Sequence, residues 1–212
     1  MKFLVDVSGA KAERIKNHPL IAGQLLTPLT RYTRWADCFA IDNGAFSGFP
    51  RKEFATLLER EKAAVQKCQF VCVPDVVGNA RRTLEIWKRR NDFVRGWPAA
   101  IVIQDGMEDF EIPWSDLAAV FIGGRDPWKD SQASQDIVKA AKVLGVHVHV
   151  GRVNTFKRFR LFHDLGADTC DGSGIAMYDH MLKDIEEKLK NDGDAVLPGF
   201  GQEAEDLSCW SD

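Results

Sequence analysis

A carboxylate flanked by glycine, Asp171, is the residue of this sequence best placed to do chemistry. It lies in the stretch 166–174, Gly-Ala-Asp-Thr-Cys-Asp-Gly-Ser-Gly, where an apolar helix passes through a few extended residues into a new amphipathic helix. A carboxylate just past the C-terminal end of a short strand in a βα repeat is where such folds carry reactive groups. We therefore expect Asp171 to be catalytic and the rest of the chain to aim a substrate at it.

Polar residues also follow the ends of other expected strands. They are Asp42, Asp75, Gln104 and the pair Gly123-Gly124. The C-terminal ends of the strands in a parallel barrel share one rim, so these residues are expected to converge with Asp171 on one pocket. Each of them alone is more simply a turn or helix-capping residue. Together, with carboxylates in glycine-rich surroundings, they favour a site.

Alternation along the strand selects Asp171 over its neighbours. Asp168 lies three residues earlier and points to the opposite face, so we expect it to pack or to support the site from behind. Cys170 faces away from Asp171 and is expected to be a buried thiol. Ser173 lacks the first glycine of a Gly-x-Ser-x-Gly motif, which argues against serine hydrolase chemistry.

The elements that would position these residues alternate along the chain. Strands are expected at 2–7, 38–42, 70–73, 99–103, 118–122, 146–150 and 167–170, with a doubtful last strand at 195–197. Helices are expected between most of them. The most regular follows Asp171, with Ile175, Tyr178, Leu182, Ile185 and Leu189 at helical spacing. Residues 10–33 predict only short helical pieces, interrupted at Pro19 and Pro28.

This alternation predicts a parallel sheet covered by helices. A closed (β/α)8 barrel of the TIM type, or a trimmed version of it, is the best interpretation, formed by one domain over 1–200 with an acidic tail at 201–212. A doubly wound open sheet is the second choice. The Gly-x-Gly-x-x-Gly signature is absent after the first strand, which weakens the dinucleotide-binding form.

Composition narrows the class of protein. The chain has 212 residues, of which 45% are hydrophobic and 28% charged, as in ordinary globular proteins. No apolar run is long enough to span a bilayer, and Asp6 comes too early for a signal peptide, so we expect a cytoplasmic protein without membrane partners. The five cysteines are odd in number, and Cys68 and Cys72 lack a second ligand pair at zinc-binding spacing. Neither disulfides nor a structural zinc is expected.

Five motifs in order resemble the tRNA-guanine transglycosylase superfamily. They are Asp42-Asn43-Gly44-Ala45-Phe46, Pro74-Asp75, Val102-Ile103-Gln104-Asp105-Gly106, Phe121-Ile122-Gly123-Gly124 and Gly166-Ala167-Asp168-Thr169-Cys170-Asp171. The resemblance spans roughly 38–174. The chain is most similar to the small phage-type enzymes that place 7-deazaguanine bases in DNA, because the zinc subdomain of the tRNA enzymes has no counterpart here.

The resemblance implies exchange of guanine for a free 7-deazaguanine, such as preQ0, at an intact sugar-phosphate backbone, without a cofactor or metal. It implies Asp171 as the nucleophile and Asp42 as the general acid and base. Asp75 and Gln104 would read the guanine edge, Gly123 or Gly124 would offer a backbone N–H to O6, and Phe46 would stack on the ring. The partners would be DNA, with RNA as the alternative, and the free base; a phage-encoded protein would act in the host cytoplasm.

The required chemistry agrees with these residue types. Displacing a base with retention needs two inversions, so one carboxylate must bond to the sugar while a second group transfers protons, as in retaining glycosidases. A carboxylate accepts from guanine N1–H and N2–H together, whereas adenine would leave the charge at Asp75 unpaired. An aromatic platform offsets part of the cost of unstacking the base, although Phe46 is about as often a plug over the barrel mouth.

Histidines and basic clusters leave two other functions open. His147 and His149 share one strand face, which permits a metal-dependent hydrolase, but the other histidines lack matching ligand spacing, and two hydrogen-bonded histidines are the favoured interpretation. Arginine clusters, including Arg31 with Arg34, permit a nucleic-acid-binding module without turnover. Arg125 and Arg152 each follow a strand end, where they are expected to contact flanking phosphates.

Overall fold

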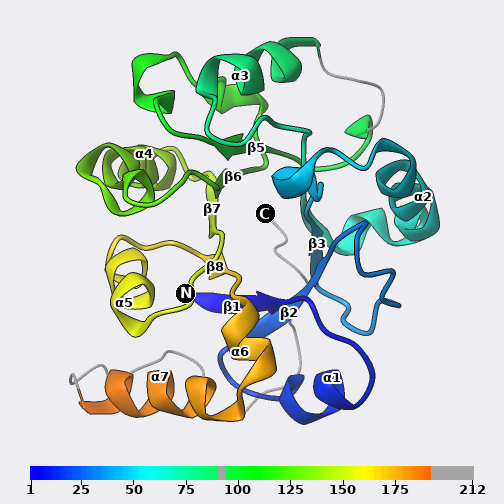
Figure 1. The fold of residues 1–212 in the computed structure, drawn as a ribbon, viewed down its shortest axis with the longest axis vertical. Helices are drawn as coiled ribbons and strands as arrows, with labels where there is room; N and C mark the ends of the chain where they lie inside the picture. Colours follow the sequence, from blue (N-terminus) through cyan, green and yellow to red (C-terminus); the bar gives the residue numbers. More distant parts are fainter. Residues whose placement is uncertain (90–93, 192–212) are drawn as a thin grey trace.

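Eight short strands pair in parallel and in chain order, and the last pairs with the first to close a barrel (Figure 1). This computed structural model describes residues 1–89 and 94–191. The strands are β1 (Lys2–Val5), β2 (Ile21–Leu26), β3 (Phe39–Ile41), β4 (Cys68–Cys72), β5 (Ala99–Ile103), β6 (Ala119–Ile122), β7 (His147–Val150) and β8 (Thr169–Cys170). The expected (β/α)8 barrel is confirmed.

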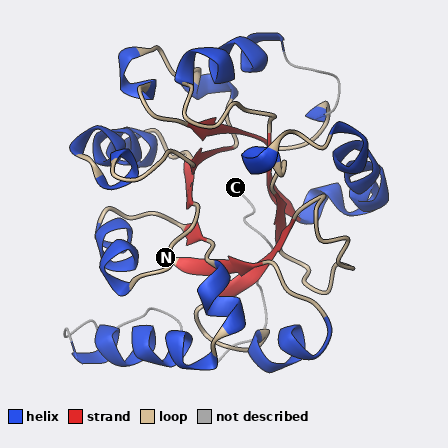
Figure 2. Cartoon of the chain, viewed as in Figure 1, coloured by secondary structure: helices blue, strands red, loops and turns tan. Residues whose placement is uncertain are grey.

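Helices surround the ring of strands, as Figure 2 shows. They are α1 (Gly9–Ile15), α2 (Arg51–Glu61), α3 (Ala80–Arg89), α4 (Gln132–Val143), α5 (Phe156–Asp164), α6 (Ser173–Met177) and α7 (Asp179–Asn191). The barrel is trimmed in two connections. Residues 27–38, between β2 and β3, contain turns but no helix, and β5 and β6 are joined through the 3-10 turns Met107–Asp109 and Trp114–Asp116.

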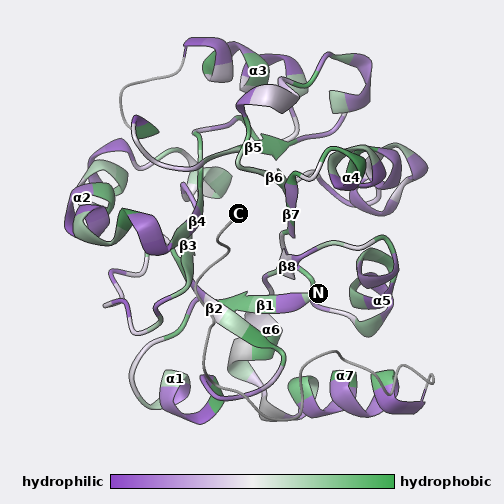
Figure 3. Cartoon of the chain, turned by 180° about the vertical axis from the view of Figure 1, so that it is seen from behind, coloured by the Kyte–Doolittle hydropathy of each residue, from purple (hydrophilic) through white to green (hydrophobic). Residues whose placement is uncertain are grey.

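Strand alternation divides the buried side chains into two layers. One set faces the barrel interior and is small in number: Leu4, Leu25, Ala40, Phe70, Cys72, Ala100, Val102, Ala119 and Phe121. The larger set lies between the barrel and its helices, whose hydrophobic stripes are visible from behind in Figure 3. Apolar residues on both faces of strands such as β5 and β6 explain why these strands appear in the sequence as continuous hydrophobic runs.

The second strand is where sequence-based prediction was wrong. Residues 21–26 form β2 and not a helical piece, and this strand completes the eight without the doubtful strand at 195–197, which lies outside the described residues. Gly23 permits the close approach of β3, since a Cβ there would lie 2.1 Å from the Cys38 carbonyl oxygen. Gln24 is buried and hydrogen-bonded to Val7 and Trp35. Both residues interrupt the apolar pattern by which a strand is recognised.

Two further expectations are corrected at the ends of elements. The first strand ends at Val5, two residues earlier than predicted. The single helix expected after Asp171 is two helices, because Tyr178 takes an extended conformation and is 51% exposed. The predicted acidic tail lies outside the described residues. None of the helices in the described ranges combines the length and apolar content that crossing a membrane requires.

We expect Gly23→Ala to destabilise the barrel by about 3 kcal/mol, the upper end of the penalty for overpacking, because a backbone carbonyl cannot move aside. Gly145→Ala is the control: its φ is +71° but nothing lies near a Cβ, so only about 1 kcal/mol of backbone strain is expected. Denaturant unfolding measures both. Equal losses would show that the contact with Cys38 is unimportant.

Candidate active site

The polar residues at the strand ends line one cavity of about 710 Å³. Its walls include Asp42, Phe46, Asp75, Gln104, Gly123, Arg152 and Asp171, all singled out from the sequence. Gly124 and Arg125 are not among the lining residues. The convergence predicted from strand-end positions therefore holds for five of the six residues concerned, Gly124 being the exception.

Asp171 is held by two hydrogen bonds. Its Oδ1 accepts from the backbone N–H of Arg152 at 2.9 Å, and its Oδ2 lies 3.1 Å from His149 Nε2. The Asp171 side chain is 19% exposed while His149 is fully buried. The carboxylate is therefore fixed in orientation from the barrel side and open to the cavity. Asp168 behaves as expected: it faces away from the cavity and accepts from Lys142 Nζ and the Val148 N–H.

A chain of hydrogen bonds through the barrel interior reaches Asp171. The Thr169 hydroxyl lies 2.9 Å from both His147 Nε2 and His149 Nδ1. Burial lowers the pKa of His147 to about 4, so that ring is neutral. A hydrogen bond donated by His149 Nε2 to the Asp171 carboxylate leaves His149 Nδ1 to accept from the Thr169 hydroxyl, whose oxygen then accepts from His147 Nε2.

The favoured interpretation of His147 and His149 as hydrogen-bonded histidines is confirmed. The His149 ring also packs between Phe121 and Phe70, with centroid distances of 4.7 and 5.1 Å. Among the described residues, no cluster of three or more His, Cys, Asp or Glu side chains has the arrangement of a metal site. The observed role of this pair is to support a carboxylate.

Asp42 lies half-buried in the same cavity. Burial, followed by the charges of Asp171 and Asp75, raises its pKa to about 7, although the backbone N–H groups of Gly44 and Asn43 favour the ionised form. At neutral pH this carboxyl is therefore poised between acid and base. Two carboxyl groups in one cavity with different environments are the arrangement by which enzymes separate a proton-transferring group from a nucleophile.

Asp75 is oriented by two amides. Asn43 Nδ2 donates to its Oδ1 at 2.8 Å, and Gln104 Nε2 donates to its Oδ2 at 2.6 Å. Burial raises the pKa of Asp75, and these two hydrogen bonds oppose that shift. Gln104 is itself fixed, because its Oε1 accepts from the Gly78 N–H at 2.8 Å. A carboxylate has lone pairs for about four hydrogen bonds, so Asp75 can still accept from a ligand.

Asp6 is a cavity residue that the sequence analysis missed. It follows β1 as Asp171 follows β8, and its Oδ1 accepts from the Thr30 hydroxyl at 3.1 Å. Burial raises its pKa to about 6, and the charge of Asp171 adds to this effect. The signal was present: had the first strand been ended at Val5, the strand-end rule would have selected Asp6.

The glycines after β6 are required by packing. A Cβ at Gly124 would lie 2.3 Å from the Trp128 ring, and one at Gly123 would lie 2.5 Å from Val102. Both N–H groups donate to the Ile103 carbonyl at 3.0 Å. These donors are thus used within the protein, which leaves the two carbonyl oxygens to face other groups.

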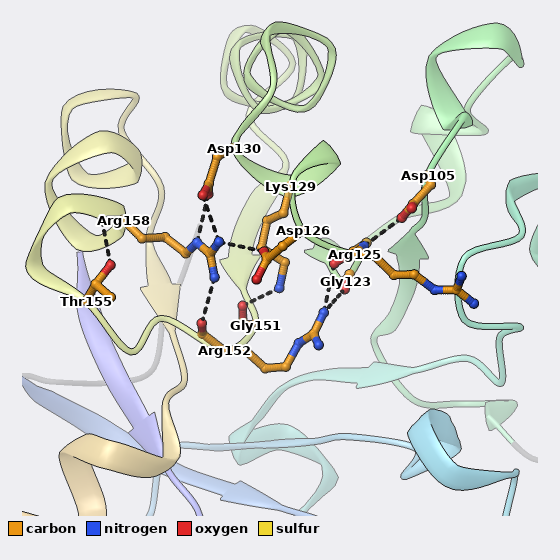
Figure 4. Close-up of polar contacts among 11 residues, drawn as sticks. Asp105, Gly123, Arg125, Asp126, Lys129, Asp130, Gly151, Arg152, Thr155 and Arg158 are labelled. Carbon is orange, nitrogen blue, oxygen red and sulfur yellow. Dashed lines mark hydrogen bonds and ion pairs between the residues drawn. The ribbon is translucent and has the colours of Figure 1, made fainter.

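Arg152 provides the partner of those carbonyls. Its Nη2 donates to Gly123 O at 3.0 Å and to Gly124 O at 2.8 Å, and its guanidinium lies 5.1 Å from the Phe46 ring centroid. The residue has φ of 59°, a strained conformation for a non-glycine residue, of the kind that gathers at functional sites. Arg125, in contrast, is exposed, and its backbone N–H donates to Asp105 (Figure 4).

Two further cations fix the end of β7, as Figure 4 shows. Lys129 is fully buried and donates to Gly151 O at 2.6 Å, and burial lowers its pKa to about 7. Arg158 pairs with Asp126 and Asp130 and donates to Arg152 O. The carbonyl oxygens of Gly151 and Arg152 therefore both accept hydrogen bonds, which fixes the segment whose N–H binds Asp171. Periodicity could not have revealed these contacts, since they join loops distant in sequence.

Thr169→Val should break the chain of hydrogen bonds in the barrel interior. The valine has nearly the same shape but leaves His147 Nε2 and His149 Nδ1 without their hydroxyl partner, so we expect the free energy of unfolding to fall by roughly 1–3 kcal/mol. Thr169→Ser keeps the hydroxyl and should stay close to wild type. Denaturant unfolding gives the energies, and nitrogen NMR of the rings should report the Nε2–H tautomer for His149 in wild type. An Nδ1–H tautomer would contradict the assigned direction.

Asp42→Asn should stabilise the protein at pH 8 but not at pH 4. The carboxyl has a pKa of 3.8 when unfolded and about 7 when folded, so the penalty for ionising it grows as pH rises between these values and is complete above pH 7. We expect a gain on the order of 4 kcal/mol at pH 8, measured by denaturant unfolding. An equal gain at both pH values would indicate better packing instead.

Comparison with known proteins finds only distant structural likenesses. The sequence matches no model of a known protein family and no curated protein. Among solved structures, the HpcH/HpaI aldolase from Desulfitobacterium hafniense DCB-2 aligns with 95% of this chain and 94% of its own, at 13% identity and a TM-score of 0.42. Neither the fold nor an activity is inferred from that likeness. The closed pairing of eight strands identifies the protein as a trimmed TIM-type barrel.

Proposed function

We propose that the protein replaces guanine in DNA by a free 7-deazaguanine base through a covalent bond between Asp171 and the sugar. The observation that carries the proposal is the pair of carboxyl groups in one cavity. Asp171 is oriented by hydrogen bonds at both oxygens, while Asp42 has a pKa raised to about 7. A nucleophile and a proton-transferring group are the two parts that exchange with retention requires.

In the first step, an Asp171 oxygen attacks the anomeric carbon of the deoxyribose, and the bond from that carbon to guanine N9 breaks. The departing base takes the bonding electrons and receives a proton from Asp42, which must be protonated at this stage. In the second step, the Asp42 carboxylate removes the N9 proton of the incoming base. That nitrogen attacks the same carbon and displaces Asp171. The reaction is balanced without a cofactor or any change of oxidation state.

The rest of the cavity supports recognition of a guanine-like ring. Asp75, fixed by Asn43 and Gln104, offers its remaining lone pairs to N1–H and the exocyclic amine. We assign the contact with O6 to the Arg152 guanidinium, because the N–H groups of Gly123 and Gly124 donate to Ile103. Arginine is the usual donor to this edge of guanine. The same contact would remove Arg152 from the face of Phe46 and free that ring for stacking.

A covalent adduct is the decisive expected product. The protein, mixed with guanine-containing DNA, should give a complex that survives a denaturing gel and disappears when preQ0 is added, as the exchanged strand is released. Asp171→Asn should give no adduct and lower exchange by roughly 10³-fold or more, because the group that forms the covalent bond is gone. Release of labelled guanine measures the exchange.

Asp168→Asn is the matched control, since this carboxylate belongs to the same segment but faces Lys142. It should form the adduct at the wild-type level. An adduct on RNA alone would move the substrate from DNA to RNA. Absence of an adduct and of guanine release on both nucleic acids would refute the proposed function.

A further inference from the structure

A second cavity, of about 360 Å³, adjoins the first. It lies between one face of α2 and the helix-free loop after β2, on the side of the barrel where Figure 1 shows these two segments. Its walls are Thr27, Pro28, Arg31, Lys52, Glu53, Thr56, Leu57 and Arg60. Thr27 also lines the central cavity, so the two cavities are neighbours at this residue. We call this second cavity the α2 groove.

The α2 groove is basic in a protein that carries a net charge of −3. Arg31, Lys52 and Arg60 contribute three cations to its walls, against the single carboxylate of Glu53. Glu61 lies nearby but is shared between Arg34 and Arg60, so it neutralises only part of their charge. The local excess of positive charge remains and would attract an anion.

Two of these cations are available to a ligand. Lys52 and Arg31 are exposed, and neither side chain makes an ion pair within the ranges that the structure describes. Arg60 is held in place, because its Nη2 donates to Tyr32 O at 2.9 Å and its Nε to Glu61 at 2.7 Å. The groove thus combines one fixed cation with two that can adjust to a ligand.

The backbone at Arg31 gives independent support. This residue has φ of 54°, and it is one of two non-glycine residues with positive φ among the described residues; the other is Arg152 in the central cavity. Non-glycine residues are uncommon in this conformation, which costs on the order of 1–3 kcal/mol. The fold therefore retains two strained arginines, one in each of two neighbouring cavities.

We infer that the α2 groove binds the phosphodiester backbone of the nucleic-acid strand whose target nucleotide enters the central cavity. This inference rests on the proposed function. Lys52 and Arg60 lie eight residues apart on α2, or about 12 Å along its axis, which is enough to follow more than one phosphate. The hydroxyl of Thr27 adds a neutral hydrogen-bond donor to the groove wall, whereas that of Thr56 already donates to Lys52 O at 2.9 Å.

Arg125 and Arg152, which the sequence predicted to contact phosphates, lie outside the α2 groove. Arg152 points into the central cavity toward Phe46 and the glycine carbonyls. Arg125 lies beside Gly78, in the loop after β4, where its guanidinium donates to Val77 O at 3.3 Å. The α2 groove places three cations next to the central cavity at Thr27, so it is the better candidate for the strand that leaves the pocket.

Binding of a fluorescent single strand, followed by anisotropy over a range of salt concentrations, tests the inference with DNA and RNA in separate arms. The variants are Lys52→Glu and Arg31→Asn; asparagine tolerates positive φ better than most residues. Each should weaken binding about tenfold, and removing a phosphate contact should reduce the slope of log affinity against log salt by about 1. Lys183→Glu, on the exposed face of α7, makes the same charge change away from the groove and should bind more nearly as wild type.

Two further measurements separate this inference from the proposed function. Free preQ0 binding, followed by calorimetry, should be unchanged in Lys52→Glu, because the central cavity is intact; a matching loss there would mean general damage and overturn the groove as the site. If both variants bind DNA or RNA as tightly as the wild-type protein does, the α2 groove is not the binding site. Exchange of guanine can still be observed in that case. Groove-dependent binding by a wild-type protein that releases no guanine supports the groove and overturns the proposed function. No binding of either nucleic acid overturns both.

Discussion

The hydrogen bond from the Arg152 N–H to Asp171 is the contact on which the site depends. It requires an arginine in a left-handed conformation at the end of β7, and that conformation is kept because both neighbouring carbonyls are bound, by Lys129 and by Arg158. A buried lysine is costly unless it is well paired or neutral. Burying Lys129 therefore holds the shape of the loop after β7 at a cost in folding free energy.

Crowding of carboxyl groups is the second constraint on the cavity. Asp6, Asp42, Asp75 and Asp171 line it together, and burial raises the pKa of the first three. Four carboxyl groups in a partly desolvated space disfavour one another's ionised forms, so the cavity favours a ligand that brings donors or positive charge. A purine edge with N–H groups meets that requirement without a metal. The same crowding lowers the stability of the barrel at neutral pH.

The rules that worked on the sequence were those with a fixed geometry. Strand alternation separated Asp171 from Asp168, and the strand-end rule brought residues from five strands to one cavity. The rules failed where tertiary contacts override local pattern. β2 contains Gly23 and the buried Gln24, which a strand alone would not favour but which its neighbours require. The hydrophobic residues around Tyr178 keep helical spacing, so the sequence predicts one helix. The extended backbone at Tyr178 nevertheless divides it into α6 and α7. Lys129 could be found only from the loop packing around Gly151.

The missing helix between β2 and β3 has a consequence for how such a barrel can change over time. Residues 27–38 form one wall of the α2 groove and share Thr27 with the central cavity, yet they carry none of the carboxyl groups proposed for chemistry. Insertions or deletions in a surface loop cost little free energy compared with changes in a strand. On the proposed function, variation there would alter which polymers approach the barrel, and from which direction, while the reaction stayed the same. Substrate range and chemistry would then belong to separate segments of one small barrel.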